Sequence, residues 1–339
     1  MTENSFQRVG IVGGGAWGTA LAHTLVGAGR DVLLWAYEPD TVQEINDHHT
    51  NRVFLPGVSL HEDVRATALL EDVADCDLML LVPPAQHLRR LAGELKDYVG
   101  PEVPLLICAK GIEQGTSKML GDVVAGEVPH ATVGALSGPS FAGEVARGLP
   151  AALTVACHDE TLGKRLAKSL GSRSLRIYWS DDLIGVQLGG AIKNVLAIAA
   201  GIVDGRQLGA NAHAALVTRG FAEMRRLGGA LGARNDTLSG LSGLGDLLLT
   251  CGSSQSRNMS LGRALGEGRS LDEVLGERRA VTEGVYTAHA MVQLSADRGV
   301  EVPIAAAVKG VVDGRLSVDE AIDGLMARPL RSETESQHL

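Results

Sequence analysis

Short apolar runs alternate with helical patterns along the first half of the 339-residue chain. The apolar runs predict strands, and they read RVGIV, DVLLWAY, CDLMLLVP, PLLICAK, ATVGALS and AALTVACH. Continuous apolar strands between helices are typical of a parallel sheet that is covered on both faces. After LRIYWSDD the strand signal disappears, and from Ile184 to about Met326 the pattern is helical and broken by glycines. The pattern therefore predicts an α/β protein in which a doubly wound parallel sheet precedes an all-helical domain.

A glycine-rich loop follows the first predicted strand and leads into a predicted helix over about Trp17 to Val26. Its spacing is Gly13-x-Gly15-x-x-Gly18. In such a loop the first glycine permits a tight turn, the second lets the backbone approach a pyrophosphate, and the third lets helix and strand pack closely. The helix N-terminus presents free N–H groups to the phosphates. A glycine turn of any α/β protein could show this spacing, but the strand and helix around it predict a Rossmann-type dinucleotide site.

The pattern and the loop together predict three segments. Residues 1–183 form the dinucleotide-binding domain, residues 184–330 form a helical substrate and catalytic domain, and residues 331–339 form a polar tail. The boundary between the domains lies near Asp181 to Gly190, where the strand signal gives way to the helical one.

The choice between NAD and NADP stays open. Glu38 stands about twenty positions after Gly18, which is the spacing of the acidic residue that binds the ribose 2′-hydroxyl of NAD. It could equally be a solvated loop residue. No arginine follows the second predicted strand until Arg52, so a dedicated clamp for the 2′-phosphate of NADP is not visible either.

Composition limits the possible binding partners of the protein and its cellular compartment. The net charge of −9 argues against nucleic acid, because binding to a phosphate backbone needs a basic face. The polar start MTENSFQR shows no secretory signal, and the longest apolar run, around Val195 to Val203, is too short to span a bilayer. We therefore expect a cytoplasmic protein with no transmembrane segment. Disulfides and a metal site are not expected either, because the four cysteines lie far apart without a CxxC pair: Cys76, Cys108, Cys157 and Cys251.

Two charged residues stand where apolar ones would be expected. Lys193, followed by Asn194, lies in the middle of IGVQLGGAIKNVLAIAAGIVDG, a run of Gly, Ala and aliphatic residues. Asp246 lies inside the glycine–leucine run SGLSGLGDLLLTC. A buried carboxylate without a partner is costly, so Asp246 should be paired or hydrogen-bonded, unless it is a helix N-cap.

Other polar residues follow predicted strands or glycine-rich segments. Lys110 follows LLICA, at the carboxyl end of a strand, where open α/β sheets bind ligands. SGPSFAGE ends the next strand with a Gly-Pro turn that carries Ser140, and SSQSRN carries Arg257, a residue type suited to bidentate phosphate recognition. Each alone could be a solvated lysine, an ordinary turn or an exposed arginine. Together with Lys193 and Asp246 they predict a pocket for a small phosphorylated carbonyl compound beside a nicotinamide.

These motifs give the chain a family resemblance. It resembles the bacterial NAD(P)-dependent glycerol-3-phosphate dehydrogenases over nearly its whole length, up to about Arg331. The motifs that carry the resemblance are GGGAWGTALA, NRVFLPG, AKGIE, SGPSFAGEVA, IGVQLGGAIKNVLAIAAGI, GANAHAALVTRGFAEM, GLGDLLLTC, SQSRN and VTEGVYTA.

The resemblance implies a role for each matching position. The catalytic residues fall on Lys193, Lys110 and Asp246. The substrate contacts fall on Lys110, Gly138, Ser140, Lys193, Asn194, Asp246, Ser256, Arg257 and Asn258. The cofactor contacts fall on Gly13, Gly15, Ala16, Trp17, Gly18, Tyr37, Lys110, Ala142, Arg257, Val281 and Glu283. Ala16 and Trp17 replace residues that are often Ser and Tyr in the family, a change that leaves the phosphate-binding backbone intact.

The resemblance also implies a reaction. Lys193 donates a proton to the alkoxide that develops when dihydroxyacetone phosphate is reduced to sn-glycerol 3-phosphate, a backbone of phospholipids. Burial and the nearby Lys110 lower the pKa of Lys193 towards neutrality, which suits a general acid. Lys110 stabilises the negative charge, Asp246 holds Lys193, and Arg257 binds the substrate phosphate. The family further implies a homodimer.

Two other functions compete with this interpretation. A β-hydroxyacid dehydrogenase would share the two-domain plan, but there the catalytic lysine and asparagine lie one helical turn apart, whereas Lys193 and Asn194 are adjacent. A non-catalytic dinucleotide sensor would have no reason to keep Lys110, Lys193, Asp246 and Arg257 together.

Overall fold

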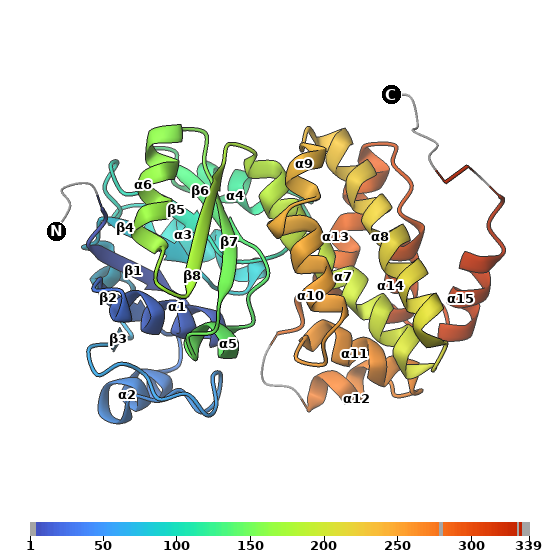
Figure 1. Cartoon of the computed structure of the whole chain (residues 1–339), viewed down its shortest axis with the longest axis horizontal. Helices are drawn as coiled ribbons and strands as arrows, with labels where there is room; N and C mark the ends of the chain where they lie inside the picture. Colours follow the sequence, from blue (N-terminus) through green and yellow to red (C-terminus); the bar gives the residue numbers. More distant parts are fainter. Residues whose placement is uncertain (1–4, 278–280, 331, 334–339) are drawn as a thin grey trace.

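The molecule has a sheet-based half and a helical half that lie side by side (Figure 1). The structure is a computed structural model, and it describes residues 5–277, 281–330, 332 and 333. Most of the expected polar tail, 331–339, therefore lies outside the described residues.

The N-terminal half is built on one eight-stranded sheet with the order β3-β2-β1-β4-β5-β6-β7-β8. Its strands are β1 (Arg8–Val12), β2 (Asp31–Trp35), β3 (Arg65–Thr67), β4 (Leu78–Leu81), β5 (Leu105–Ile107), β6 (Val133–Ser137), β7 (Ala151–Ala156) and β8 (Leu175–Ser180). The helices of this half are α1 (Ala16–Gly27), α2 (Pro39–His48), α3 (Leu88–Leu95), α4 (Leu120–Glu127), α5 (Ala142–Ala146) and α6 (Glu160–Leu170). The predicted Rossmann-type fold class is confirmed, and β3 is a short edge strand that the apolar pattern did not predict.

The sheet is not parallel throughout, because β7 runs antiparallel to β6. The other pairings are parallel, including β1 with β2 and with β4. The connection between β6 and β7 holds only α5, a helix of five residues. Such a helix is about 7.5 Å long, which is too short to carry the chain back along a strand of about 17 Å. The polypeptide therefore turns back near the carboxyl end of β6 and forms β7 in the opposite direction. The expectation of an all-parallel sheet was wrong at this one step.

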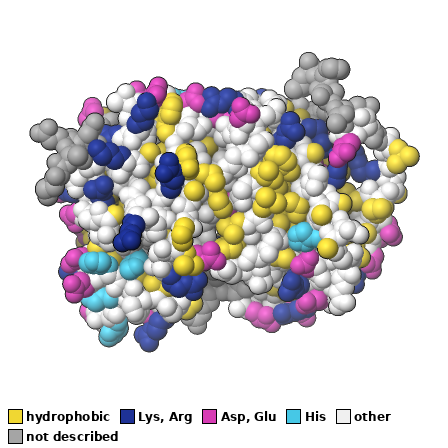
Figure 2. Space-filling model, viewed as in Figure 1, with side chains coloured by type: hydrophobic (Ala, Val, Ile, Leu, Met, Phe, Trp, Pro, Cys, Tyr) yellow, Lys and Arg dark blue, Asp and Glu magenta, His cyan; other side chains and the backbone are white. Residues whose placement is uncertain are grey.

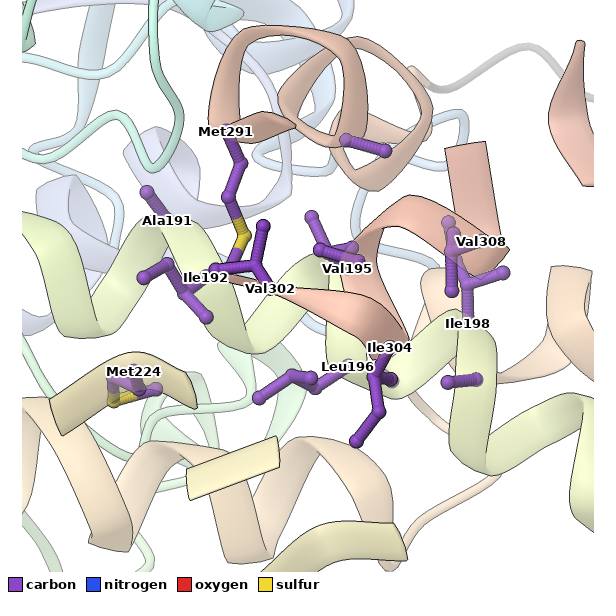
Figure 3. Close-up of a cluster of buried hydrophobic side chains, with 14 of the residues drawn as sticks. Ala191, Ile192, Val195, Leu196, Ile198, Met224, Met291, Val302, Ile304 and Val308 are labelled. Carbon is purple, nitrogen blue, oxygen red and sulfur yellow. The ribbon is translucent and has the colours of Figure 1, made fainter. Parts of the chain in front are cut away.

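The helical half surrounds one long central helix, α7 (Leu183–Gly205). The other helices of this half are α8 (Gly209–Leu231), α9 (Asn235–Leu238), α10 (Asp246–Cys251), α11 (Arg257–Gly266), α12 (Leu271–Gly276), α13 (Glu283–Asp297), α14 (Pro303–Val312) and α15 (Val318–Met326). Figure 3 shows Ile192, Val195 and Leu196 of α7 among side chains from the surrounding helices, such as Met224 of α8 and Met291 of α13. The core of this half is therefore organised around α7.

One part of the membrane expectation was wrong. The whole helix Leu183–Gly205 has 23 residues, and its most apolar window has a mean hydropathy of 1.6, so the helix is long and apolar enough to cross a membrane by length and composition. The run Val195 to Val203 is only the most apolar part of this helix. In the structure 94% of its most apolar window is buried inside the protein, as is common for a core helix.

Glycines let α7 approach its neighbours at backbone distance. A Cβ on Gly201 would lie 2.0 Å from the carbonyl oxygen of Met259, and one on Gly262 would lie 1.9 Å from that of Ile198. Only glycine fits such a contact between α7 and α11. On the side of the sheet, a Cβ on Gly190 would lie 2.6 Å from Ser137 Oγ and 3.4 Å from Lys110 Cγ. The glycines of the run therefore bring α7 against the ends of β5 and β6.

Candidate active site

The glycine loop has the geometry that its spacing predicts. Gly13 has a φ of +127°, which favours glycine, and a Cβ there would lie 2.8 Å from the backbone of Val82. A Cβ on Gly18 would lie 1.9 Å from the carbonyl oxygen of Gly13, so α1 could not pack on the loop with a larger residue. At Gly15 nothing lies within 4 Å of an added Cβ, so this face of the loop is open to a ligand. No side chain caps the first turn of α1.

Polar atoms without partners fit a cofactor at this loop. Trp17 Nε1 and Glu283 Oε2 are buried and have no hydrogen-bond partner among the described residues. Glu283 Oε1 accepts from the backbone N–H of Ala85, just past β4, at 3.0 Å. Burial raises the pKa of Glu283 to about 7, and the bond from Ala85 and the charge of Arg257 oppose that rise. Glu283 thus carries an unpaired oxygen at the carboxyl ends of the strands.

The other expected cofactor residues lie on several different elements. Ala142 begins α5, which packs against α1, and Ala16 begins α1 itself. Val281 comes shortly before α13. Tyr37 follows β2 and is 70% exposed, with its ring edge-on to Trp35. Tyr37 thus lies on the surface, whereas Glu283 is half-buried and its Oε2 atom is inaccessible to solvent.

Lys110, Lys193 and Asp246 meet at one buried point. Asp246 is fully buried, and each of its carboxylate oxygens accepts from one ammonium: Oδ1 from Lys193 Nζ and Oδ2 from Lys110 Nζ, both at 2.5 Å. Asp246 is the first residue of α10 and not its N-cap, which is Gly245, so the N-cap alternative was wrong. Lys193 Nζ also donates to Thr250 Oγ1 at 2.9 Å, and Lys110 Nζ donates to the carbonyl oxygen of Gly138 at 3.1 Å.

The charge balance of this cluster is positive. Two ammonium groups face a single carboxylate among the described contacts. Each ammonium has three N–H donors, and each lysine uses two of them on the contacts above, which leaves one donor on each lysine. Burial lowers the pKa of Lys193 to about 8; the charge of Asp246 opposes this shift and that of Lys110 adds to it. The arrangement can therefore bind an oxyanion and exchange a proton with it near neutral pH.

The turn after β6 lies beside Lys110. Gly138 has a φ of +141°, and its carbonyl oxygen accepts from Lys110 Nζ and, at 3.1 Å, from Ser140 Oγ. Ser140 is thus placed next to the lysine pair. Gln255 Nε2 donates to Glu144 Oε1 at 2.9 Å, which joins the SGPSFAGE segment to the SQSRN segment of the helical half.

The SQSRN segment forms the start of α11. Ser256 is the N-cap, and its hydroxyl accepts from the N–H of Met259 at 3.2 Å. Arg257 is open to solvent, yet the surrounding protein desolvates it enough to lower the pKa of its guanidinium, while the charge of Glu283 opposes that shift. Arg257 therefore lies close enough to Glu283 for the two charges to interact. Asn258 is buried and donates to Asn194 Oδ1 at 3.0 Å.

Sequence reasoning missed Thr250 and the contact between Glu283 and Ala85. Thr250 follows Asp246 by one helical turn, and residues four apart on a helix share a face, so GDLLLT did contain a signal for it. The bond from Ala85 to Glu283 joins residues 198 positions apart, and nothing local in the sequence indicates it.

Comparisons with known proteins agree with this geometry. The family model described as the N-terminus of NAD-dependent glycerol-3-phosphate dehydrogenase matches residues 8–163, and the corresponding C-terminal model matches residues 182–323. The chain belongs to the NAD-dependent glycerol-3-phosphate dehydrogenase family. The resemblance inferred from the motifs is thereby confirmed.

Individual relatives of this glycerol-3-phosphate dehydrogenase family are similar over almost their full length. A glycerol-3-phosphate dehydrogenase [NAD(P)+] of Parvibaculum lavamentivorans is 54% identical over 97% of this chain and 99% of the relative. One of Caulobacter vibrioides is 53% identical, again over 97% and 99%. The crystal structure of glycerol-3-phosphate dehydrogenase from Coxiella burnetii superposes with a TM-score of 0.91 at 37% identity, covering 95% of this chain and 99% of that one.

Proposed function

We propose that this chain catalyses the reversible, NAD(P)H-dependent reduction of dihydroxyacetone phosphate to sn-glycerol 3-phosphate. The observation that carries the proposal is the buried pair of ammonium groups, Lys110 and Lys193, on the single carboxylate of Asp246. The excess positive charge suits a substrate that is anionic and that gains negative charge on its oxygen during reduction. Membership of the family supports the identity of the substrate.

Lys193 is proposed as the proton donor in reduction and the proton acceptor in oxidation. Its contacts with Asp246 and Thr250 hold the Nζ in place and leave one N–H for the substrate oxygen. The lowered pKa, about 8, means that both protonation states are accessible near neutral pH. Lys110 adds a second positive charge beside that oxygen and stabilises the developing alkoxide.

Arg257 is proposed to bind the substrate phosphate. It begins α11, a helix of ten residues, and the N-terminus of a helix favours negative charge. A guanidinium can form two parallel bonds to a phosphate, and the helix terminus favours the same negative charge. Ser140, on the turn beside Lys110, is proposed as a further substrate contact.

The glycine loop and the face near Glu283 are proposed to hold the dinucleotide. The open space at Gly15 and the unpaired atoms of Trp17 and Glu283 fit such a group. When bound, the nicotinamide supplies or takes up the hydride. Both NAD and NADP remain compatible with the residues after β2, since Glu38 is exposed and Arg52 is paired with Glu44.

The proposal extends to organisation and context. We propose that residues 1–183 act as the cofactor domain and residues 184–330 as the substrate domain, that the chain works as a cytoplasmic homodimer, and that its product supplies phospholipid synthesis. The homodimer and the cellular role are supported by the family resemblance. Light scattering on the purified chain tests the dimer, since a monomer at micromolar concentration would overturn it.

The decisive experiment follows the ultraviolet absorbance of the reduced nicotinamide with dihydroxyacetone phosphate and, separately, with β-hydroxyacids in the oxidative direction. Turnover of the phosphate ester alone is expected, and turnover of the hydroxyacids alone would favour the competing dehydrogenase. Lys110→Ala should abolish most of the activity, because its ammonium lies on Asp246. Lys118→Ala is the matched control, because Lys118 is an exposed lysine nearby in the sequence. If neither substrate turned over, a dinucleotide sensor would remain.

A further inference from the structure

A chain of buried side-chain amides crosses the site between the two proposed binding regions. The N–H of Gly284 donates to Asn258 Oδ1 at 2.9 Å, Asn258 Nδ2 donates to Asn194 Oδ1 at 3.0 Å, and Asn194 Nδ2 donates to the carbonyl oxygen of Lys110 at 3.3 Å. Asn194 and Asn258 are only 6% and 8% exposed. The chain thus joins α13, α11, α7 and the segment after β5.

The direction of every bond in this chain is fixed by its two ends. A backbone N–H can only donate and a backbone carbonyl can only accept. Asn258 must therefore turn its oxygen to Gly284 and its nitrogen to Asn194, and Asn194 must turn its nitrogen to Lys110. Each position needs a side chain that both donates and accepts. An aspartate at either position would keep the acceptor and lose the donor.

The two ends of this hydrogen-bonded series of amides belong to different binding regions. At one end is the backbone of Lys110, whose ammonium lies on Asp246. At the other end is the first turn of α13, where Glu283 contacts the N–H of Ala85. A Cβ on Gly284 would lie 2.6 Å from the carbonyl oxygen of Asn194 and 2.7 Å from Asn258 Oδ1, so this turn is pressed directly against the amides.

We propose that Asn194 and Asn258 are positioning residues that couple the cofactor face at Glu283 to Lys110, so that a ligand in either region favours binding in the other. The inference rests on the proposed function, because it takes the two regions to bind a dinucleotide and a phosphorylated substrate. A ligand that orders one end of the chain orders the amides and, through them, the other end. Such coupling is reciprocal, so one ratio of affinities measures it.

The test measures the dissociation constant of NADH by fluorescence titration, with and without saturating glycerol 3-phosphate. Glycerol 3-phosphate is already reduced, so the complex with NADH does not turn over. The ratio of the two constants should be about tenfold in the wild type. Asn194→Ala and Asn258→Ala should each weaken the binding of NADH measured without glycerol 3-phosphate. Each should also bring the ratio of the two dissociation constants close to one.

Non-additivity separates a shared chain from two independent contacts. Because either substitution breaks the same chain, the double variant should be no worse than the single variants. If Asn258→Ala fails to fold, Asn258→Asp replaces it, because it keeps the bond from Gly284 and loses the one to Asn194. Asn51→Ala is the matched control, because Asn51 is also buried and donates to Gly14 and Thr19 near the glycine loop. In this variant NADH binding should weaken while the ratio of the two dissociation constants stays unchanged.

Two outcomes would overturn the inference. One is a wild-type ratio near one, and the other is single variants that keep the wild-type ratio or whose effects multiply in the double variant. Either result leaves the proposed function standing as long as dihydroxyacetone phosphate is turned over. Absence of that turnover in the wild type would instead overturn the proposed function.

Discussion

The glycine loop and the lysine pair are built in opposite ways. The loop, Gly13 to Gly18, works through backbone and through the absence of side chains, within six residues of sequence. The lysine pair works through side-chain charges: Lys110 and Asp246 are 136 positions apart, and Lys193 and Asp246 are 53 apart. The loop is therefore sensitive to added atoms, and the lysine pair is sensitive to lost charge.

The largest effect should follow from removing the proton donor. Lys193→Ala should lower kcat by about 10²–10⁴-fold, the usual contribution of a general acid. NADH binding, measured by fluorescence titration, should stay unchanged, because the glycine loop does not depend on this charge. Lys193→Arg should fail as well, because a guanidinium does not release its proton near neutral pH. Near-normal turnover in either variant would remove Lys193 from the mechanism.

The next effect concerns the phosphate. Arg257→Ala should cost about 2–5 kcal/mol of binding, the typical loss when one partner of a desolvated charge pair is removed. The preference of this variant for dihydroxyacetone phosphate over dihydroxyacetone should largely vanish. Arg257→Lys should show a preference between those of the wild type and Arg257→Ala, because it keeps the charge but loses the two parallel guanidinium donors.

A control for that variant lies on the same helix. Arg263→Ala removes an arginine of α11 that pairs with Asp204, so it should keep the substrate preference. NADH affinity is measured in parallel because Arg257 lies near Glu283. An Arg257→Ala enzyme that still discriminates as the wild type does would make this residue an ordinary surface arginine.

Two glycines of the loop should respond differently to an added side chain. Gly18→Ala places a Cβ 1.9 Å from the carbonyl oxygen of Gly13, so it should destabilise the fold by about 1–3 kcal/mol in urea unfolding. Gly15→Val meets no protein atom within 4 Å of its Cβ, so it should leave stability unchanged and weaken NADH and NADPH alike. Unaltered cofactor binding in Gly15→Val would place the dinucleotide elsewhere.

The smallest effect is a shift of pH dependence. Reduction needs the ammonium form of Lys193, so its rate should fall above about pH 8, whereas oxidation needs the neutral amine and should rise up to about that pH. Asp246→Asn removes the charge that opposes the lowering of this pKa, so both transitions should move to lower pH. Profiles of kcat/KM in both directions measure this, and a shift to higher pH would contradict the assigned role of Asp246.

The contrast between the regions also explains what could be predicted from the sequence. The geometry of the loop could be predicted from the sequence because its turn, its open face and its close packing are each set by one glycine at a fixed spacing. The lysines and Asp246 were noticeable because charges are rare in apolar runs. Their mutual contacts were implied by the family resemblance alone and not by the residue pattern, since they depend on how closely Gly190 lets α7 approach the sheet.

Other features needed the tertiary structure altogether. The amide chain uses Asn194 and Asn258, which the sequence offered only as substrate contacts by resemblance. The antiparallel β7 depends on the length of α5, and the periodicity of the strands does not reveal it. The exposure of Tyr37 and the buried Oε2 atom of Glu283 depend on neighbours distant in sequence.

The position of α7 restricts how enzymes of this design can diversify. The helix is buried from Gly185 to Val203, and it carries both the proton donor and the glycines that fit against neighbouring backbones. Few substitutions along this helix would be neutral, so new substrate specificities should rarely arise from changes in it. Changes of substrate should instead arise in the turn around Ser140 and in the segment before α11, which lie at the rim of the site and can vary without disturbing the core.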